Sequence, residues 1–347
     1  MQELFDIEFL RQKSVESLVN LGMPNNDADV LVDSMLAADI NGVSTHGIRM
    51  LPAYIQKLNK GAYSFTQPVV IKRFPAFTII DAQNNIGAVS ASCAVEIAIK
   101  QAEVNGIHIV FSRNSNTFGP AFYYVEKIAN SGMIGFVCSN APAAMPAVNG
   151  LEAMLGTNPF AFAMPTKSYG NIVMDMATSI VAKSRFGIAK AKGEKLGQGW
   201  ALDKNGNPTT DPDEGIKGFV LPMAGFKGYG IAMMIDIMSG FLSGAGFLSN
   251  VGKFYSENDT CMNVGHMIVA VNPKIIFDGD FLSEADKYVD TLKKSKVMDG
   301  KTIVIPGDDR KSYKKEALKN GISLTQDVVD KLEILFNEKL CIKNQVG

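Results

Sequence analysis

The sequence predicts a mixed α/β (α+β) protein in which helices from both chain ends form one domain and a mixed core is inserted between them. Apolar residues recur at helical spacing in the first 60 residues and again after residue 310. Between about residues 68 and 275, short apolar runs alternate with helical stretches. The 347 residues suffice for two domains. We therefore predict a helical domain of residues 1–70 with 284–347, and a second domain of residues 71–283.

The elements follow in order along the chain. Helices are expected around residues 10–18 and 28–40, the second capped by Asn26 or Asp27, and over residues 49–58. Strands are expected at 69–72, 77–81, 108–111, 134–138, 158–164, 172–174 and 267–271, and helices at 86–104 and 231–242. Residues 203–206 predict a hairpin turn. Helices over 311–318 and 325–338 close the chain, and a capping box of Ser323 and Gln326 opens the last one.

Charge and cysteine usage argue against several classes of protein. The net charge is −1, and the basic run at 311–319 is interrupted by apolar residues, so neither nucleic acid nor a membrane is expected as a partner. The N-terminus lacks the pattern of a signal peptide, and no apolar run reaches the roughly 20 residues that span a bilayer. Four cysteines without a C-x-x-C pair indicate reduced thiols in a cytoplasmic protein, and the three histidines favour no metal site.

Residues 41–49 combine groups that suit a small 2-hydroxy or 2-oxo acid. His46 can exchange a proton near neutral pH. Arg49 can hold a carboxylate through two parallel hydrogen bonds. Gly42 and Gly47 let the backbone approach a small ligand closely. Taken alone, the same stretch is better explained as a glycine-capped helix end with polar residues on the turn.

Two further stretches fit a phosphate-bearing ligand, although no G-x-G-x-x-G follows a predicted strand. Glycine-rich residues 225–230, which include Lys227, precede a predicted helix and would present free N–H groups; a flexible loop is the alternative. At residues 173–179 a strand ends at Asp175, a candidate partner for His46, and Thr178 or Ser179 would cap a following helix. His108 and His266 are interpreted as packed core residues.

In this order and spacing, the motifs resemble the malate/L-lactate dehydrogenase family, whose members include ureidoglycolate and sulfolactate dehydrogenases, diketogulonate reductase and piperideine-carboxylate reductase. The resemblance runs over nearly the whole chain. It is carried by Gly42-x-x-x-His46-Gly47-x-Arg49-x-x-x-x-Tyr54, Asn114-Ser115-Asn116-x-Phe118-Gly119, Leu155-Gly156-Thr157-Asn158-Pro159, Asp175-x-Ala177-Thr178-Ser179, Gly199-Trp200-Ala201, Lys227-Gly228-Tyr229-Gly230 and Pro306-Gly307-Asp308.

The resemblance implies a fold, a cofactor and roles for single residues. The second domain would be a non-Rossmann NAD- or NADP-binding domain on a mixed, largely antiparallel sheet flanked by helices, and the protein would be a homodimer. His46 would donate and accept the proton with Asp175 as its partner. Arg49 would hold the substrate carboxylate, and Ser44, Tyr54 and Thr117 would line the pocket. The cofactor would contact Asp175, Met176, Ala177, Thr178, Ser179, Lys227, Gly228, Gly307 and Asp308.

One position departs from the family pattern. Family members commonly carry histidine in the Asn-Ser-Asn-x-Phe-Gly loop, where this chain has Thr117, which can form a hydrogen bond but cannot titrate near neutral pH. The main hypothesis is reversible hydride transfer between a nicotinamide cofactor and a small 2-hydroxy or 2-oxo acid. A reductase of cyclic imino acids and a cofactor-binding protein with little catalysis are the alternatives. A hydrolase based on Ser44 is disfavoured because no nucleophile elbow surrounds it.

Overall fold

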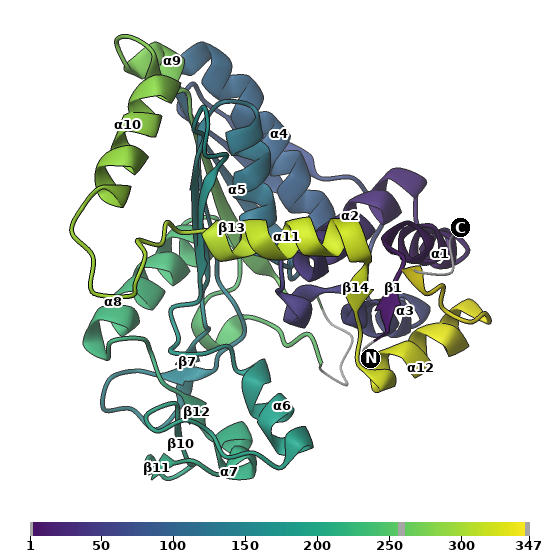
Figure 1. Cartoon of the computed structure of the whole chain (residues 1–347). Coiled ribbons are helices and arrows are strands. Elements are labelled where there is room, and N and C mark those ends of the chain that lie inside the picture. Colours follow the sequence, from purple (N-terminus) through teal and green to yellow (C-terminus); the bar gives the residue numbers. More distant parts are fainter. Residues whose placement is uncertain (1–2, 256–260, 344–347) are drawn as a thin grey trace.

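A seven-stranded sheet forms the centre of the protein, whose computed structural model describes residues 3–255 and 261–343 (Figure 1). In spatial order the strands are β2 (Val69–Arg73), β3 (Phe77–Asp81), β4 (Ile107–Ser115), β13 (Val264–Val271), β5 (Ile134–Ser139), β8 (Phe160–Met164) and β9 (Ile172–Met176). In this sheet β3 and β4 run parallel, and every other neighbouring pair is antiparallel. The expected mixed, largely antiparallel sheet is confirmed, and its strand order is not that of a Rossmann fold.

Helices cover both faces of this sheet. On one face α4 (Gly87–Asn105) and α5 (Ala121–Asn130) pack against Val110, Val137 and Ile268, which are fully buried (Figure 1). On the other face lie α8 (Phe226–Ile235) and the short π-helix η3 (Asp236–Phe241), and Ile235 belongs to the apolar cluster there. The sheet is therefore the middle layer of three. Because helices cover both of its faces, a site is expected among the loops at the ends of the strands.

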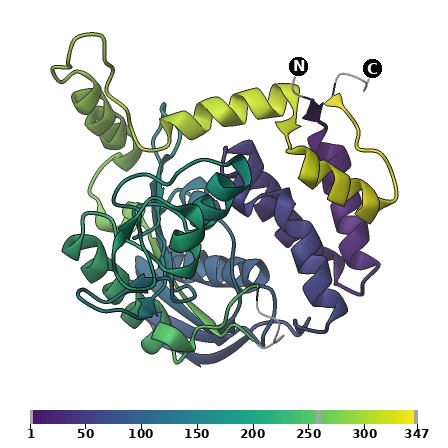
Figure 2. The same cartoon turned by 90° about the horizontal axis from the view of Figure 1, so that it is seen from below.

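Helices from the two chain ends pack together beside the sheet (Figure 2). The N-terminal part contributes α1 (Ile7–Val19), α2 (Asn25–Ile40) and α3 (Leu51–Asn59), and the C-terminal part contributes α12 (Gln326–Phe336). Their shared core includes Leu10, Leu31 and Leu332. Strands β1 (Leu4–Phe5) and β14 (Ile322–Ser323) pair antiparallel and join the two ends. Helix α11 (Asp308–Asn320) runs from the sheet to this bundle (Figure 1).

The predicted domain boundary at residue 284 falls inside α10 (Phe281–Lys293). This helix follows α9 (Pro273–Ile276) and lies beside the β9 side of the sheet, where Val289 is buried with Ile172 and Ile305. The Asp286 carboxylate also accepts the backbone N–H groups of Lys167 and Ser168. The structure thus associates α10 with the sheet rather than with the terminal helices.

A small lobe that the sequence did not predict lies beyond one end of the sheet. It contains α6 (Ser184–Lys192), α7 (Pro212–Lys217) and a three-stranded sheet of β11 (Pro208–Thr209), β10 (Ala201–Leu202) and β12 (Phe219–Val220). Strands β6 (Met145–Pro146) and β7 (Ala153–Leu155) pair nearby, and η4 (Leu248–Asn250) contacts β7. The predicted hairpin turn at Asp203 is confirmed between β10 and β11, where its carboxylate accepts the N–H groups of Asn205 and Asn207.

Two predicted helix caps were wrong. Helix α2 begins at Asn25 after Pro24, and the Asp27 carboxylate accepts the Gln67 side-chain amide instead of capping the helix. Helix α12 begins at Gln326, whose side chain donates to Asp330, so Gln326 is the first helical residue and cannot complete a capping box. The partner of Asp27 is remote in sequence, whereas that of Gln326 lies one turn further along the same helix.

The glycine-rich stretch at residues 225–230 is helical, not a loop. Helix α8 begins at Phe226, with Gly225 as the preceding residue at φ 60°. Its residues Ala232 and Ile235 are buried, and this packing against the sheet outweighs the low helix propensity of the glycines. No helix in the described parts of the chain is both long and apolar enough to cross a membrane.

Candidate active site

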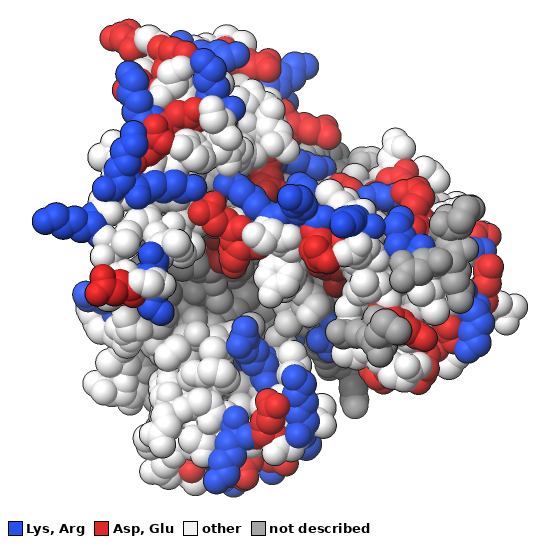
Figure 3. Space-filling model, in the orientation of Figure 1, with Lys and Arg blue, Asp and Glu red and all other residues white. Residues whose placement is uncertain are grey.

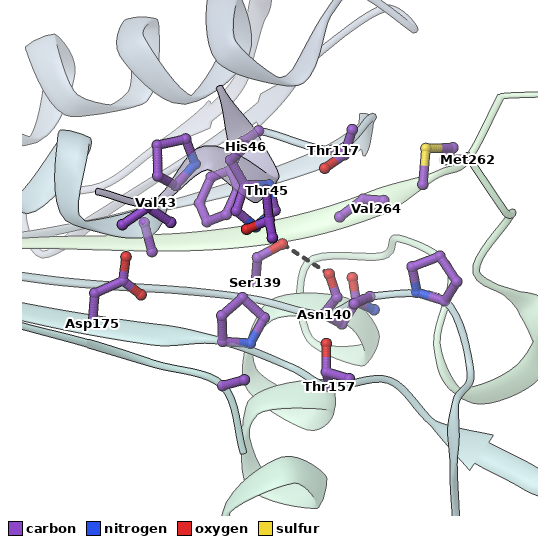
Figure 4. A pocket seen from close by; sticks show the side chains of 18 of the residues that line it. Val43, Thr45, His46, Thr117, Ser139, Asn140, Thr157, Asp175, Met262 and Val264 are labelled. Atoms are coloured by element: carbon purple, nitrogen blue, oxygen red, sulfur yellow. Dashed lines mark hydrogen bonds between the residues drawn. The ribbon is translucent and has the colours of Figure 1, made fainter. Parts of the chain in front are cut away.

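A cavity of about 330 Å³ lies between the turn that follows the N-terminal helix α2, the sheet and α11. Its walls come from segments far apart in sequence: the turn after α2, the loop between β4 and α5, the ends of β5 and β9, the start of β13, and α11. Figure 4 shows His46, Thr45 and Thr117 on one side, opposite Asp175, Ser139, Asn140 and Thr157. This volume suits a small acid together with the reacting ring of a cofactor.

His46 ends the short 3-10 helix η1 (Ser44–His46), which directly follows the end of α2. His46 is exposed to solvent and lines the cavity, and partial desolvation by the neighbouring protein lowers the pKa of the imidazole. A lowered pKa keeps the ring neutral at neutral pH, which is the form that accepts a proton.

The other two histidines are core residues, as the sequence predicted. His108 and His266 are fully buried. The ring of His108 bonds Thr78 and the Pro75 carbonyl, and that of His266 bonds Ser115 and Ser139. Burial lowers the pKa of His266 to about 3. His46 is therefore the histidine available for proton transfer.

Asp175 and Arg310 form the charged end of the cavity. The Oδ2 atom of Asp175 accepts the backbone N–H of Phe122 at 3.0 Å and lies 4.0 Å from Nη2 of Arg310. The Arg310 guanidinium also stands 4.7 Å from the centre of the Phe122 ring. Burial raises the pKa of the Asp175 carboxyl, while the Arg310 charge and the Phe122 N–H oppose this rise.

The partnership of His46 with Asp175 stays a prediction, because no hydrogen bond joins the two side chains in the described structure. Both residues line the cavity, but the hydrogen bond that the Asp175 carboxylate accepts in the described structure comes from Phe122.

Thr117 lines the cavity on a tightly held loop. The side-chain amide of its neighbour Asn116 donates to the Asn84 side chain and the Asn85 carbonyl, and its oxygen accepts the Met262 N–H. Gly87 at the start of α4 packs so closely that a Cβ there would overlap the carbonyl groups of this loop. The Thr117 hydroxyl is thus placed by the surrounding backbone.

Three predicted pocket residues do not line this cavity. Tyr54 is buried in the helical core, where its ring packs edge-on against Phe254 at 5.2 Å. Arg49 is exposed on η2 (Ile48–Met50). The extended Gly47 separates this turn from the one that carries His46, and Arg49 does not line the cavity. Ser44 lies in a neighbouring groove, and it is Thr45 that faces the cavity.

Of the predicted cofactor residues, Asp175 and Ala177 line the cavity, and Met176 beside them is exposed. The hydroxyls of Thr178 and Ser179 donate to the backbone carbonyls of Thr157 and Val181. The expected helix cap at Thr178 or Ser179 was wrong, because these residues hold the chain beside β8 and the next helix, α6, begins only at Ser184.

The other two predicted cofactor segments lie outside the cavity lining. Gly307 has φ 96° in the turn before α11, and the Asp308 carboxylate accepts the Ile305 N–H, so this segment is a turn that starts a helix. Lys227 and Gly228 lie in the first turn of α8, where a Cβ on Gly228 would overlap the Met223 carbonyl.

Among the polar residues that line the cavity, sequence reasoning missed five: Thr45, Ser139, Asn140, Thr157 and Arg310. Thr45 and Thr157 stand within motifs that were noticed, and Arg310 follows the Pro306-Gly307-Asp308 turn, so adjacency to these motifs was an available signal. Asn140 had none, because its role depends on long-range bonds to Gly246 and Gly265.

A family model described as malate/L-lactate dehydrogenase matches residues 5–333. The chain belongs to the malate/L-lactate dehydrogenase family. It is 34% identical over 326 residues to L-sulfolactate dehydrogenase of Methanocaldococcus jannaschii, covering 93% of this chain and 94% of that one. The crystal structure of malate dehydrogenase from Entamoeba histolytica superimposes with a TM-score of 0.92 at 28% identity, covering 98% of this chain and 99% of the other.

Members of this family are NAD(P)-dependent dehydrogenases, and the matches include both cofactor types. The (2R)-3-sulfolactate dehydrogenase (NADP(+)) of Chromohalobacter salexigens is 29% identical, covering 96% of this chain and 98% of that one. The ureidoglycolate dehydrogenase (NAD(+)) of Escherichia coli K12 is 30% identical, covering 97% of each chain. Either dinucleotide is therefore consistent with this member of the malate/L-lactate dehydrogenase family.

Proposed function

We propose that this dehydrogenase transfers a hydride reversibly between C2 of a small 2-hydroxy acid and NAD or NADP. The observation that carries the proposal is one cavity in which a neutral histidine, His46, faces an acid and a guanidinium, Asp175 and Arg310. A proton acceptor and an anion-binding group in one enclosed space are what oxidation of a hydroxy acid requires.

The cavity also fits the reacting ring of the cofactor. Phe118, Pro142 and Val264 provide apolar surface, and Asn140 and Thr157 provide polar groups beside it. Bound there, the nicotinamide supplies the hydride acceptor for oxidation or the donor for reduction. Because the cavity holds about 330 Å³, the rest of the dinucleotide extends beyond it.

In the oxidation direction His46 accepts the proton of the C2 hydroxyl. Its lowered pKa keeps the imidazole neutral before the reaction, and the carboxylate of Asp175 stabilises the imidazolium that forms. Thr117 donates a hydrogen bond to the substrate oxygen in place of the histidine that the family commonly has there. In reduction, His46 returns the same proton.

Arg310 replaces Arg49 in the proposal as the group that faces the substrate carboxylate. It is the permanently charged cation among the described residues that line the cavity. Its Nη1 atom is buried without a hydrogen-bond partner in the described structure. A substrate carboxylate would supply the missing acceptor, and it would fix which face of C2 meets the cofactor.

We further propose that the enzyme is a cytoplasmic homodimer. Large apolar side chains are exposed along one side of α8 and η3: Phe226, Met233, Met234, Ile237, Phe241 and Leu242. An apolar strip of this kind is typical of a protein–protein interface, and a second copy of the chain is the proposed occupant. The four free cysteines support a reducing compartment.

The proposed function is tested by following NADH and NADPH oxidation with a panel of 2-oxo acids and cyclic imino acids. We expect turnover of at least one 2-oxo acid with one of the two cofactors. Turnover of imino acids alone would establish the reductase alternative. Cofactor binding without turnover of any acid would instead favour a binding protein with little catalysis.

A further inference from the structure

Asp39 lies on the last turn of α2, where a carboxylate is electrostatically unfavourable. It faces the negative end of the helix dipole and is half-buried. Burial raises the pKa of this carboxyl to about 7, although the Ile48 N–H and the Arg49 charge oppose the rise. Side chains that violate such local rules often serve a site nearby.

The Asp39 carboxylate anchors the turn that carries His46. Its Oδ2 atom accepts the backbone N–H of Ile48 at 2.6 Å. Gly47, between His46 and Ile48, lies directly against the carboxylate, and a Cβ on Gly47 would overlap both oxygens. Gly47 has φ −81° and ψ −165°, which any residue adopts, so glycine is needed here for the close approach alone.

We propose that Asp39 is a positioning residue: its carboxylate, seated against Gly47 and bonded to Ile48, holds the η1–η2 turn so that His46 faces the cavity. The inference rests on the proposed function, because it assumes that His46 is the proton acceptor. It also explains why glycine directly follows the histidine, since any larger residue would push the carboxylate away from the turn.

The histidine content gives a readout that does not depend on turnover. His108 and His266 are fully buried, whereas His46 is exposed. The reaction of diethyl pyrocarbonate with the folded full-length protein therefore reports on His46, and the imidazole signals in NMR give its pKa directly. If the turn loses its anchor, both the reaction rate and the pKa of His46 change.

The decisive variant is Asp39→Ala. Displacing a catalytic group by about 1 Å can cost on the order of 100-fold in rate, so we expect a loss of that size in kcat. We expect KM for the cofactor to stay within about threefold of wild type, because the cofactor contacts other walls. Diethyl pyrocarbonate should modify His46 severalfold faster in this variant than in the wild-type protein. Asp39→Asn should restore most of kcat, because its amide oxygen still accepts the Ile48 N–H.

Asp33→Ala is the matched control. Asp33 lies on the same helix, but it accepts hydrogen bonds from Arg11 and Tyr123 and none from the His46 turn in the described structure. This variant should keep the wild-type kcat and modification rate. If Asp39→Ala also kept both wild-type values, Asp39 would not position His46.

Gly47→Ala tests the same contact if Asp39→Ala does not fold. The added Cβ must displace the carboxylate, so we expect a similar loss of kcat and a similar change at His46; unchanged values would overturn the proposal. The double variant, Asp39→Ala with Gly47→Ala, should lower kcat little more than either single substitution, because both substitutions remove the same contact.

If the wild-type protein reduces no acid at all, the proposed function fails. The rates at which diethyl pyrocarbonate modifies His46 in the wild type and in the variants still decide the role of Asp39.

Discussion

At the scale of single residues, His46 carries the chemistry of the proposal. His46→Ala should lower kcat by about 100- to 10,000-fold, the usual contribution of a positioned acid or base. Binding of NADH or NADPH, measured by fluorescence titration, should stay close to wild type. Ser131→Ala is the control, since the Ser131 hydroxyl bonds the Ile128 carbonyl and does not line the cavity. Retention of wild-type turnover by His46→Ala would remove this histidine from the mechanism.

Arg310 is predicted to set the acid side of the pH profile. Burial raises the pKa of Asp175, and the Arg310 charge opposes this rise. In Arg310→Met the pKa should therefore rise further, so the ionised fraction at a given pH falls. The acid limb of kcat/KM should then move to higher pH. Arg310→Lys keeps the charge, so its acid limb should stay, although KM for the acid should increase because the two-pronged geometry is lost.

Residue identities were easier to predict from sequence than side-chain directions. The importance of His46 followed from its motif, and Thr117 lines the cavity as expected. Arg49 was placed in the pocket by its ability to hold a carboxylate and by the family resemblance, but the extended Gly47 separates its turn from that of His46. Asp39 was overlooked because its proposed role depends on a tertiary contact, in which its carboxylate accepts the Ile48 N–H, and no sequence pattern indicates that contact.

At the scale of elements, α6 places cations beside the cavity. Arg185, Lys192 and Lys195 line a groove that shares Val43 and Thr45 with the cavity wall. Figure 3 shows Lys and Arg side chains over α6 and over α11, on either side of a hollow. These charges should attract anionic ligands and raise their encounter rate, an effect that salt weakens.

Replacement of Arg185 and Lys192 by glutamine should therefore raise KM for the acid or the dinucleotide, with kcat little changed, and should flatten the dependence of kcat/KM on ionic strength. Lys190→Gln is the matched control, because Lys190 lies on the same helix but pairs with Asp213 away from this groove. An equal response of the double variant and Lys190→Gln would contradict a specific role for the groove.

Elements were predicted well where their own residues determine them. The apolar runs that became β3, β5 and β9 and the small-residue helix α4 were found within a few residues of their ends. The start of α8 was not, because glycines at residues 225–230 indicate a loop unless the buried face of the helix is known. The cap predicted at Asp27 failed for a related reason, since its partner Gln67 is remote in sequence.

At the scale of the whole molecule, the exposed apolar strip on α8 and η3 should hold two copies together. Ile237→Glu should shift the wild-type dimer toward monomer in size-exclusion chromatography with light scattering, because it introduces a charge into the apolar contact. Ile334→Glu is the control, since Ile334 is exposed on α12 at the other end of the chain. A monomeric wild-type protein would refute the proposed homodimer.

The overall arrangement was partly predictable. Helices at both chain ends suggested a shared bundle, and that packing is present in the structure. The insertion of β13 between β4 and β5 and the separate small lobe were not foreseen, because strand order depends on long-range pairing that no local pattern encodes. Val264 of β13 lines the cavity, so the lining could be named only in part.

The most direct test of the central claim is to follow the hydrogen on C2 of the substrate. With the 2-hydroxy acid identified by the panel, prepared with deuterium at C2, we predict that the deuterium appears at C4 of the nicotinamide in the reduced cofactor, as measured by mass spectrometry and NMR. His46→Ala should slow this transfer by about 100- to 10,000-fold without changing the position that receives the deuterium. Reduced cofactor that carries no deuterium would contradict hydride transfer from C2, and with it the reaction proposed for this cavity.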